Sequence, residues 1–306
     1  MIPLFVLAID HRDSLRRWHR ERFGPRPDEH EVLRALKHLA LDGLLAALGD
    51  DLGRAEVALL TDDEYGADVL ARAKRSGIAT AVAVEKSGER EFCFEHDAHY
   101  ANYLDALDPT FAKALVRYNP RGDVDRNSRS RERLGILQQH LRDRGRPLIV
   151  ELLVPPEPFQ LDALDGDRAR YDRVVRPELT LDALDELIHS GLQPRYWKVE
   201  GQATLDAYRR LAVVAAGDIG SGCLVLGRGE DRPIVDRWIS LAAQVDGFAG
   251  FAVGRTIWLD AVLQWRLGRA TYDQAVVMIA DAFRRLVMLY RDNAHRLAGH
   301  QATVNS

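Results

Sequence analysis

The chain has 306 residues, 46% hydrophobic and 29% charged, a composition typical of a soluble protein with a large apolar core. Its formal net charge of -4 argues against a nucleic-acid-binding protein, because such proteins are usually basic overall. Two cysteines, Cys93 and Cys223, provide neither a disulfide framework nor a metal-binding spacing, so we expect a reducing, cytoplasmic location. No uninterrupted apolar run is long enough to cross a bilayer, and we expect no contact with a membrane.

The first residues predict a buried strand rather than a signal peptide. Met1–Ala8 is apolar but short, lacks a basic region and leads directly into Asp10-His11-Arg12. No linker rich in Pro, Gly or Ser interrupts the chain, and there is no internal repeat. We therefore expect one domain spanning residues 1–306.

Short apolar runs alternate with longer amphipathic segments along the chain. The runs are rich in Val, Ile, Leu and Ala without strict alternation, which is typical of parallel strands covered on both faces. The predicted strands are Leu4–Asp10, Val57–Asp63, Ala79–Glu85, Phe111–Tyr118, Leu148–Pro155, Tyr196–Gly201, Cys223–Gly229 and Gly250–Thr256. The predicted helices between them include Glu31–Leu48, Arg131–Arg144, Leu181–Ser190, Thr204–Ala216 and Pro233–Ala243.

Eight strands that alternate with helices predict an α/β fold, a single (β/α)8 TIM barrel. A doubly wound sheet is the alternative, but no Gly-x-Gly-x-x-Gly motif follows the first strand. Tyr272–Leu297 predicts an extra, long amphipathic helix that covers the barrel or mediates assembly, and we expect a homo-oligomer. Arg121–Arg133 is a polar loop entering a helix, either a solvated face or, because it follows a strand, a segment that reaches a phosphate.

Charged residues gather at the carboxyl ends of the predicted strands, where TIM barrels carry their active sites. Burying so many charges at one end is costly unless they pair with each other or with a ligand. Taken singly, Asp10 could cap a helix and His11 could be structural. The candidate site residues, in chain order, are Asp10, His11, Arg12, Glu85, Lys113, Arg117, Glu151, Lys198, Glu200, Gly227, Arg228, Gly254 and Arg255.

Lys198 is the most informative of these residues. It lies inside the apolar run Tyr196–Gly201, where loss of water raises the free energy of its charged form. A neutral amine is the nucleophile that forms a Schiff base with a carbonyl compound. The alternative is a structural lysine paired with Glu151 or Glu200.

The residue types present suit a Schiff-base aldolase without a metal. Lys198 supplies the amine, Glu151 on the preceding strand acts as general acid and base, and Lys113 is a second cation that favours a neutral Lys198. The histidines are scattered, and the pair His96-x-x-His99 is weak evidence by itself, so we expect no metal and no cofactor beyond the lysine.

Two similar loops predict a phosphate-binding end. Gly227-Arg228-Gly229 and Gly254-Arg255-Thr256 follow the seventh and eighth strands, whose loops commonly bind phosphate in TIM barrels. Glycine lets the backbone approach the anion, and arginine clamps it with two hydrogen bonds. Tight turns with solvated arginines are the alternative.

Several motifs at these strand ends appear in the order of a known family. They are Ala8–Arg12, Asp63–Gly66, Val84–Gly88, Ala112–Pro120, Val150–Pro155, Trp197–Gly201 and Gly250–Ile257. They resemble the DUF2090-type domain joined to the kinase of inositol catabolism and assigned as 2-deoxy-5-keto-gluconate-6-phosphate aldolase. They are more distantly similar to the class I tagatose-1,6-bisphosphate aldolases. The resemblance runs from about Leu4 to the C-terminal helix.

The resemblance implies a TIM barrel with Schiff-base catalysis. It places the covalent lysine on Lys198 and the acid/base carboxylate on Glu151. Other site residues that it implies are Asp10, Glu85 and Lys113, with Arg255 and Arg228 at the phosphate. Two features depart from the family pattern. His11 stands where tagatose-type enzymes carry glutamine, and we expect no fused kinase, so the resemblance by itself does not imply a role in inositol catabolism.

The sequence therefore predicts a class I aldolase that cleaves a phosphorylated keto-sugar or keto-sugar acid, of the 2-deoxy-5-keto-gluconate-6-phosphate type, to dihydroxyacetone phosphate and an aldehyde. One alternative is a metal-independent isomerase or epimerase, in which Glu151 and Glu85 move the proton and Lys198 only polarises a carbonyl. Another is a non-catalytic sugar-phosphate sensor. In each case the expected partner is a phosphorylated small molecule.

Overall fold

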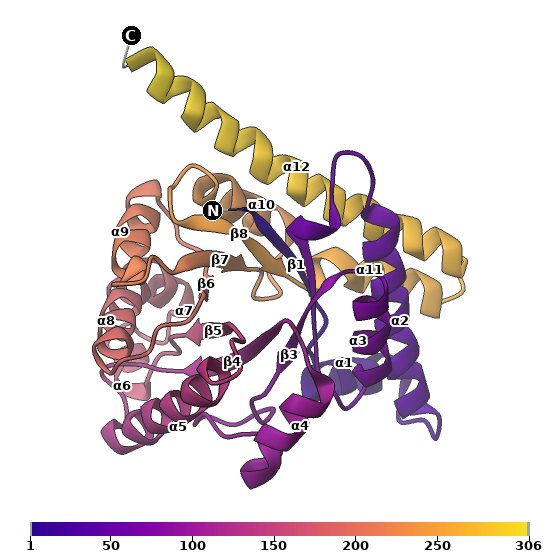
Figure 1. Cartoon of the computed structure of the whole chain (residues 1–306), viewed down its shortest axis with the longest axis horizontal. Coiled ribbons are helices and arrows are strands. Elements are labelled where there is room, and N and C mark those ends of the chain that lie inside the picture. The colour runs from indigo at the N-terminus through magenta and orange to yellow at the C-terminus, as the bar shows by residue number, and fades with distance from the viewer. Residues whose placement is uncertain (1, 305–306) are drawn as a thin grey trace.

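The computed structural model describes residues 2–304, and the side chains of residues 2–294. Eight parallel strands close into one barrel, in which every strand pairs with its neighbours in sequence and β1 pairs with β8 (Figure 1). The strands are β1 (Leu4–Ala8), β2 (Val57–Thr61), β3 (Ala79–Ala83), β4 (Phe111–Arg117), β5 (Leu148–Leu153), β6 (Tyr196–Glu200), β7 (Gly222–Leu226) and β8 (Phe248–Val253). The predicted (β/α)8 barrel is confirmed. The ends of the predicted domain, residues 1 and 305–306, lie outside the described residues.

Helices follow the strands and surround the barrel (Figure 1). The longer ones are α1 (Asp13–Phe23), α2 (Glu29–Ala47), α3 (Ala67–Arg75), α4 (Tyr100–Leu107), α5 (Val124–Arg142), α8 (Arg176–His189), α9 (Leu205–Ala216), α10 (Arg232–Ala242), α11 (Arg255–Arg266) and α12 (Tyr272–Val304). Between β5 and α8 lie the short helices α6 (Pro158–Asp162) and α7 (Arg168–Arg170) and the π-helical turn η3 (Tyr171–Val175). None of the described helices combines the length and the apolar character needed to cross a membrane.

The segment 121–133 is mostly helical rather than a loop. α5 begins at Val124 because the side chain of Asp123 accepts a hydrogen bond from the backbone N–H of Arg126 and caps the first turn. Arg126 binds Glu157, and Arg129 and Arg133 bind Glu91. No arginine of this segment lines the central cavity described below. The structure thus favours the solvated face over the phosphate-reaching loop.

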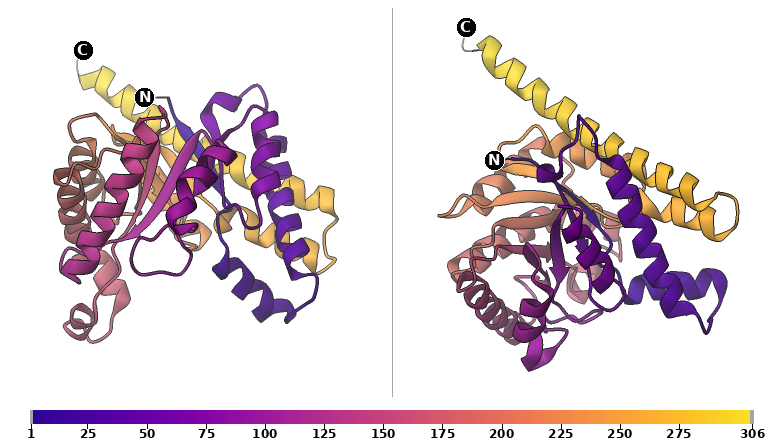
Figure 2. Two further views of the ribbon diagram at one scale, coloured as in Figure 1. Left: turned by 60° about the horizontal axis from the view of Figure 1, so that its bottom comes forward. Right: turned by 45° about the vertical axis from the view of Figure 1, so that its right-hand side comes forward.

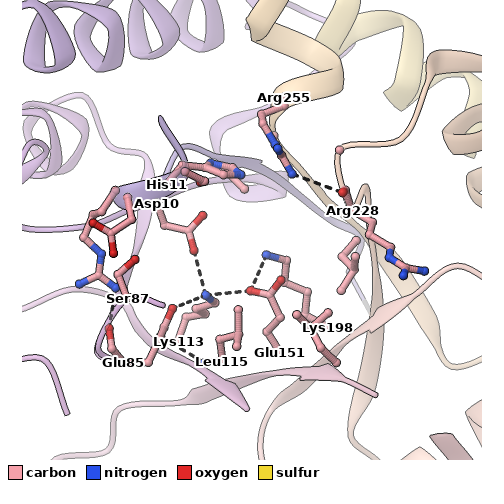
Figure 3. A pocket seen from close by; sticks show the side chains of 18 of the residues that line it. Asp10, His11, Glu85, Ser87, Lys113, Leu115, Glu151, Lys198, Arg228 and Arg255 are labelled. Carbon is pink, nitrogen blue, oxygen red and sulfur yellow. Dashed lines mark hydrogen bonds and ion pairs between the residues drawn. The ribbon is translucent and has the colours of Figure 1, made fainter. Parts of the chain in front are cut away.

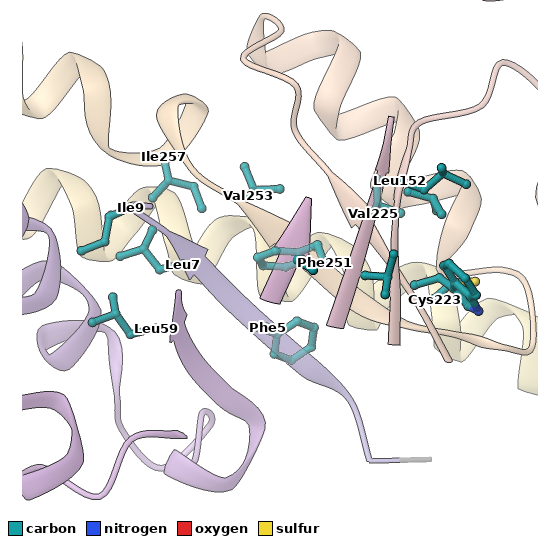
Figure 4. Close-up of a cluster of buried hydrophobic side chains, with 14 of the residues drawn as sticks. Phe5, Leu7, Ile9, Leu59, Leu152, Cys223, Val225, Phe251, Val253 and Ile257 are labelled. Carbon is teal, nitrogen blue, oxygen red and sulfur yellow. The ribbon is translucent and has the colours of Figure 1, made fainter. Parts of the chain in front are cut away.

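The alternation of side chains along each strand separates two apolar layers. Phe5 and Leu7 of β1 point outward and pack with Leu59, Val225 and Phe251 in the layer between barrel and helices (Figure 4). The inward residues Leu4, Val6 and Ala8 belong to a second cluster that fills the barrel interior. That inner cluster also includes Ala58, Leu60, Ala81, Ile149, Tyr196 and Leu224.

The inward face of three strands changes from an apolar to a charged residue along the strand. With a period of two, Ile149 on β5 is followed by Glu151, and Tyr196 on β6 by Lys198. On β4 the residue two positions after Phe111 is Lys113. The lower barrel is therefore apolar and its carboxyl end is charged, which places these three side chains in one layer.

The C-terminal helix α12 is tied to the barrel through α2. Figures 1 and 2 show it lying across α2, where Tyr272 donates to Asp42 and Arg284 donates to the carbonyl of Ala47. Gly43 of α2 makes this approach possible, because a Cβ there would lie 2.4 Å from Cγ2 of Ile279 on α12. The predicted covering helix is confirmed, and it continues beyond the predicted end to Val304.

We predict that Gly43→Ala lowers the free energy of unfolding by about 1–3 kcal/mol, because the added methyl group overpacks the contact with Ile279. Gly135→Ala on α5 is the matched control, since its Cβ would meet no atom within 4 Å, and it should raise stability by about 0.5–1 kcal/mol. Urea unfolding measures both. A Gly43→Ala variant as stable as the Gly135→Ala variant would contradict the packing argument.

Candidate active site

A cavity of about 370 Å³ opens at the carboxyl ends of the strands. All of the predicted site residues except Glu200 line it: Asp10, His11, Arg12, Glu85, Lys113, Arg117, Glu151, Lys198, Gly227, Arg228, Gly254 and Arg255. Figure 3 shows the lysines and carboxylates at its floor. The strand ends thus bring together residues that lie far apart in the sequence.

Lys113 binds three carboxylates at the floor of the cavity. Its Nζ lies 2.9 Å from Oδ2 of Asp10, 2.6 Å from Oε1 of Glu85 and 2.8 Å from Oε2 of Glu151. Burial opposes the charge on Lys113, but Asp10, Glu151 and Glu85 outweigh it and raise the pKa of Lys113 well above its usual value. The Lys113 ammonium group is therefore held charged.

Lys198 is held by a single carboxylate, which it shares with Lys113. Its Nζ lies 2.9 Å from Oε2 of Glu151, and the two residues face each other directly across β5 and β6. This is the only ion pair or side-chain hydrogen bond of Lys198 among the described residues. Of the two carboxylates considered as partners of Lys198, Glu151 is the one that binds it. The amine of Lys198 thus has one carboxylate partner among the described residues, whereas that of Lys113 has three.

Two of the carboxylates are stabilised in their ionised form. Burial alone would raise the pKa of Glu151, but Lys113 and Lys198 outweigh burial and lower it. The same balance holds at Asp10, where Lys113 and Lys198 overcome burial and bring the pKa well below its usual range. Both groups are thus carboxylates at neutral pH, and Glu151 is an acceptor beside the Lys198 amine.

His11 lies at the cavity as a neutral imidazole. Burial lowers the pKa of His11 to about 4, even though Asp10 acts in the opposite direction. The ring packs edge-on against Trp258 with centroids 5.7 Å apart, and its Nδ1 is buried without a hydrogen-bond partner among the described residues. His11 therefore lines the cavity, and its buried Nδ1 has no partner among the described residues.

Arg12 and Glu200 are engaged within the protein. The Arg12 guanidinium donates to Oε2 of Glu95 and to the carbonyl of Glu85, both at 2.5 Å, and so joins the loops after β1 and β3. Glu200 does not line the cavity, because its carboxylate turns to the backbone N–H of Val154 at 3.1 Å and to Arg228. Glu200 was predicted to contact the substrate, but its carboxylate does not reach the cavity.

The loops after β7 and β8 lie side by side as predicted, but their arginines differ. Nη2 of Arg255 donates to the carbonyl of Arg228 at 3.3 Å, and its Nε is buried without a partner among the described residues. The Arg228 guanidinium instead binds Asp172 at 2.8 Å, and Figure 3 shows this side chain turned away from Lys198. Gly229 has φ +78°, and a Cβ there would lie 2.3 Å from Nη2 of Arg255.

The cavity also includes cations that the site prediction left out. Arg17 on α1 and Lys86 after β3 line it, and neither side chain has a hydrogen bond or ion pair among the described residues. Lys86 falls within a motif quoted from the sequence, so its place after a strand was a usable signal. The sequence gives no such signal for Arg17, because its position at the cavity depends on how α1 lies over the mouth of the barrel.

Together, these features define a class: a (β/α)8-barrel protein with a buried lysine–carboxylate cluster at the carboxyl ends of its strands. The chain belongs to the family described as "Uncharacterized protein conserved in bacteria (DUF2090)", whose model matches residues 2–294. The predicted DUF2090-type membership is confirmed. No curated protein matches the sequence.

Two solved structures are similar in fold. One is fructose-bisphosphate aldolase from Plasmodium falciparum in complex with TRAP and a small-molecule inhibitor, with a TM-score of 0.65 and 11% identity over 95% of this chain and 91% of that chain. Another is Cgl0159 from Corynebacterium glutamicum, with a TM-score of 0.57 and 16% identity over 93% of this chain and 85% of that chain. At such identities the likeness establishes the barrel fold. Within the described residues, no group of three or more His, Cys, Asp or Glu side chains is arranged to hold a metal ion.

We predict that removing Lys113 lowers the stability of the protein far more than removing Lys198. Lys113→Met leaves Asp10 and Glu85 without their cation and should lower the free energy of unfolding by about 3–5 kcal/mol. Lys198→Met should change it by less than about 1 kcal/mol, because Glu151 keeps Lys113. Denaturant unfolding of both variants provides the comparison. Equal losses of stability in the two variants would contradict the view that Lys113, and not Lys198, holds the carboxylate cluster together.

The lowered pKa values of Asp10 and Glu151 predict acid sensitivity. Since both carboxylates ionise more readily in the folded state, their contribution to stability is present above their ordinary pKa values, near 4. It is lost as the pH falls from about 5 towards the folded-state values. Between pH 7 and pH 4, the free energy of unfolding should fall less in Asp10→Asn than in the wild type. An identical decrease in both proteins would show that Asp10 does not contribute to the acid sensitivity.

Proposed function

We propose that this protein is a class I aldolase in which Lys198 forms a Schiff base with a phosphorylated keto-sugar or keto-sugar acid. The observation that carries the proposal is the single Glu151 oxygen that lies 2.9 Å from Lys198 and 2.8 Å from Lys113. One lysine is fixed as a cation by three carboxylates, and the other has one carboxylate placed to take its proton. The barrel shared with a fructose-bisphosphate aldolase supports the same reaction class.

The first step uses the hydrogen bond already present between Lys198 and Glu151. The ammonium proton passes to the carboxylate, and the neutral amine attacks the substrate carbonyl carbon. The protonated Glu151 then donates to the carbinolamine hydroxyl, which leaves as water and gives the iminium. Lys113 remains charged throughout, because Asp10, Glu85 and Glu151 hold its ammonium group.

Carbon–carbon cleavage follows from the iminium. A carboxylate of the cluster, which we assign to Glu151, removes the proton of the substrate hydroxyl, and the bond electrons move into the iminium to form an enamine. The aldehyde leaves, the enamine takes a proton at carbon, and water hydrolyses the resulting iminium. These steps release dihydroxyacetone phosphate and regenerate the Lys198 amine.

The two sides of the cavity suit a substrate with an anionic group at each end. Arg255 and the glycines of the β7 and β8 loops lie on one side, where the N-terminus of α11 adds backbone donors for a phosphate. Across the barrel, at the ends of β3 and β4, lie Lys86 and Arg117. This arrangement favours a phosphorylated keto-sugar acid of the 2-deoxy-5-keto-gluconate-6-phosphate type, with its carboxylate opposite its phosphate.

The isomerase alternative is less well supported. It requires Glu85 to exchange a proton with the substrate, yet Oε1 of Glu85 accepts from Lys113 at 2.6 Å and Oε2 accepts from the backbone N–H of Leu115 at 3.1 Å. Both oxygens of Glu85 are therefore engaged. Glu151 alone retains the position beside a reactive amine.

We further propose a cytoplasmic homo-oligomer that needs no metal or cofactor. Cys93 and Cys223 are both free thiols, as a reducing compartment would leave them. The helix α12 exposes Val277 and Met288, apolar side chains that a neighbouring subunit could cover. Size-exclusion chromatography with light scattering tests the assembly.

Borohydride reduction in the presence of dihydroxyacetone phosphate should fix an adduct on Lys198, because the imine is reduced to a stable secondary amine. Peptide mapping by mass spectrometry should find the adduct on Lys198 and none on Lys113, whose amine is held protonated. Lys198→Arg serves as the control and should show neither adduct nor cleavage. Trapping that fails on Lys198, or turnover that survives in Lys198→Arg, would replace the covalent mechanism with the isomerase.

A screen of phosphorylated keto-sugars and keto-sugar acids, coupled to detection of dihydroxyacetone phosphate, tests the substrate class. We expect cleavage of a keto-sugar acid phosphate, and a KM increase of at least about tenfold in Arg117→Met if its cation binds the carboxylate end. The effect should be small for substrates without the carboxylate. An equal KM change for both substrate types would argue against this orientation.

A further inference from the structure

Behind the β7 loop, two arginines share two carboxylates. Arg228 donates to Oδ2 of Asp172 at 2.8 Å, and its Nε lies 3.3 Å from Oε1 of Glu200. Arg176 donates from Nε to Oδ1 of Asp172 at 3.0 Å and from Nη2 to the carbonyl of Gly201 at 3.1 Å. Asp172 lies in the π-helical turn η3, which leads directly into α8. The four side chains form one hydrogen-bonded and ion-paired network beside the cavity.

Arg176 retains one unused donor in this network. Its Nη1 is buried without a hydrogen-bond partner among the described residues and lies 3.8 Å from Oε2 of Glu200. A buried guanidinium N–H without a partner is costly, so its position beside a carboxylate calls for an explanation. A small movement would let Nη1 donate to Glu200.

Arg228 is placed between this network and the cavity. It lines the cavity and has φ +53°, a left-handed conformation, with Gly227 and Gly229 on either side. Arg255, on the other side of the same loop, has no carboxylate partner among the described residues and contacts the carbonyl of Arg228. One arginine of the predicted phosphate clamp thus remains available, and the other is occupied by carboxylates.

We propose that Arg228 is an anion-responsive side chain, which Asp172 and Glu200 hold in the ligand-free protein and which turns to a phosphate group bound at the β7 and β8 loops. A phosphate competes well with a carboxylate for a guanidinium because it offers more charge and a matching bidentate geometry. When Arg228 leaves, the unused Nη1 of Arg176 donates to Glu200, so this buried carboxylate does not lose its neutralising partner.

The proposal assigns new roles to residues outside the cavity. Asp172 and Glu200 are positioning residues, since each contact with Arg228 must weaken before Arg228 can bind the phosphate. Arg176 lowers the free energy needed for Arg228 to leave, because its Nη1 then donates to Glu200. The inference rests on the proposed function in one respect, that the ligand carries a phosphate, and requires no Schiff base.

Isothermal titration calorimetry with inorganic phosphate tests the proposal on the purified full chain. Asp172→Asn keeps the size of the side chain and removes the charge that holds Arg228, so phosphate should bind about two- to fivefold tighter. Arg228→Gln should bind about tenfold weaker. Asp172→Asn added to Arg228→Gln should have no further effect. Glu178→Gln, which breaks the exposed pair of Glu178 with Arg210, is the matched control and should bind as the wild type does.

An unchanged or weaker affinity in Asp172→Asn would overturn the proposal, as would tighter binding that persists without Arg228. A crystal structure of the wild type with phosphate is the second measurement. It should place Arg228 on the phosphate and Nη1 of Arg176 within hydrogen-bond distance of Glu200. A phosphate bound to Arg255 while Arg228 still contacts Asp172 would contradict it. Neither readout depends on turnover, so failure of the aldolase proposal is recognised separately by borohydride trapping.

Discussion

The interaction on which the site depends is the contact of the Lys113 ammonium group with carboxylates from three different parts of the barrel. Asp10 follows β1, Glu85 follows β3 and Glu151 lies on β5, and all three bind the one Nζ on β4. A buried cation with this many partners is stable only if the closed barrel holds the strands in register. Closure of the barrel and assembly of the site are therefore one structural requirement.

The loop that carries Asp10 has further support from behind. Lys37 of α2 is buried, binds Asp62 and donates to the carbonyls of Ile9 at 2.7 Å and His11 at 3.2 Å. These contacts fix the backbone on both sides of Asp10. They also account for a third buried lysine, which, unlike Lys113 and Lys198, does not line the cavity. Within this rigidly supported cluster, Lys198 binds a single carboxylate among the described residues, that of Glu151, which it shares with Lys113.

Much of this arrangement could be predicted from the sequence because it follows from backbone periodicity. Apolar runs predicted the eight strands and placed Lys113 and Lys198 on two of them. The structure adds that both side chains lie on the inner face, two residues after Phe111 and Tyr196. Each predicted run extended past its strand into the following loop, and some of these loop residues line the cavity: Asp10, Glu85, Gly227, Arg228, Gly229, Gly254 and Arg255. The order of the motifs also predicted the DUF2090 family.

What the sequence did not reveal depends on side-chain direction and on distant loops. Glu200 shares the inner face of β6 with Lys198, yet its carboxylate turns to Val154 and away from the cavity. Asp172, which binds Arg228, lies in η3, 56 residues earlier in the chain, and no spacing rule connects the two residues. The position of Arg17 over the cavity likewise requires the path of α1 to be known. Such contacts become visible only once the whole chain is folded.

The central claim is that two buried lysines a few ångströms from one carboxylate have different reactivity. Reductive methylation of the native protein with formaldehyde and cyanoborohydride, followed by quantitative mass spectrometry over time, measures the reactivity of each amine directly. The account predicts that Lys198 is methylated while Lys113 stays unmodified until the protein is unfolded. Methylation of Lys113 at the rate of Lys198, or ahead of it, would contradict the account.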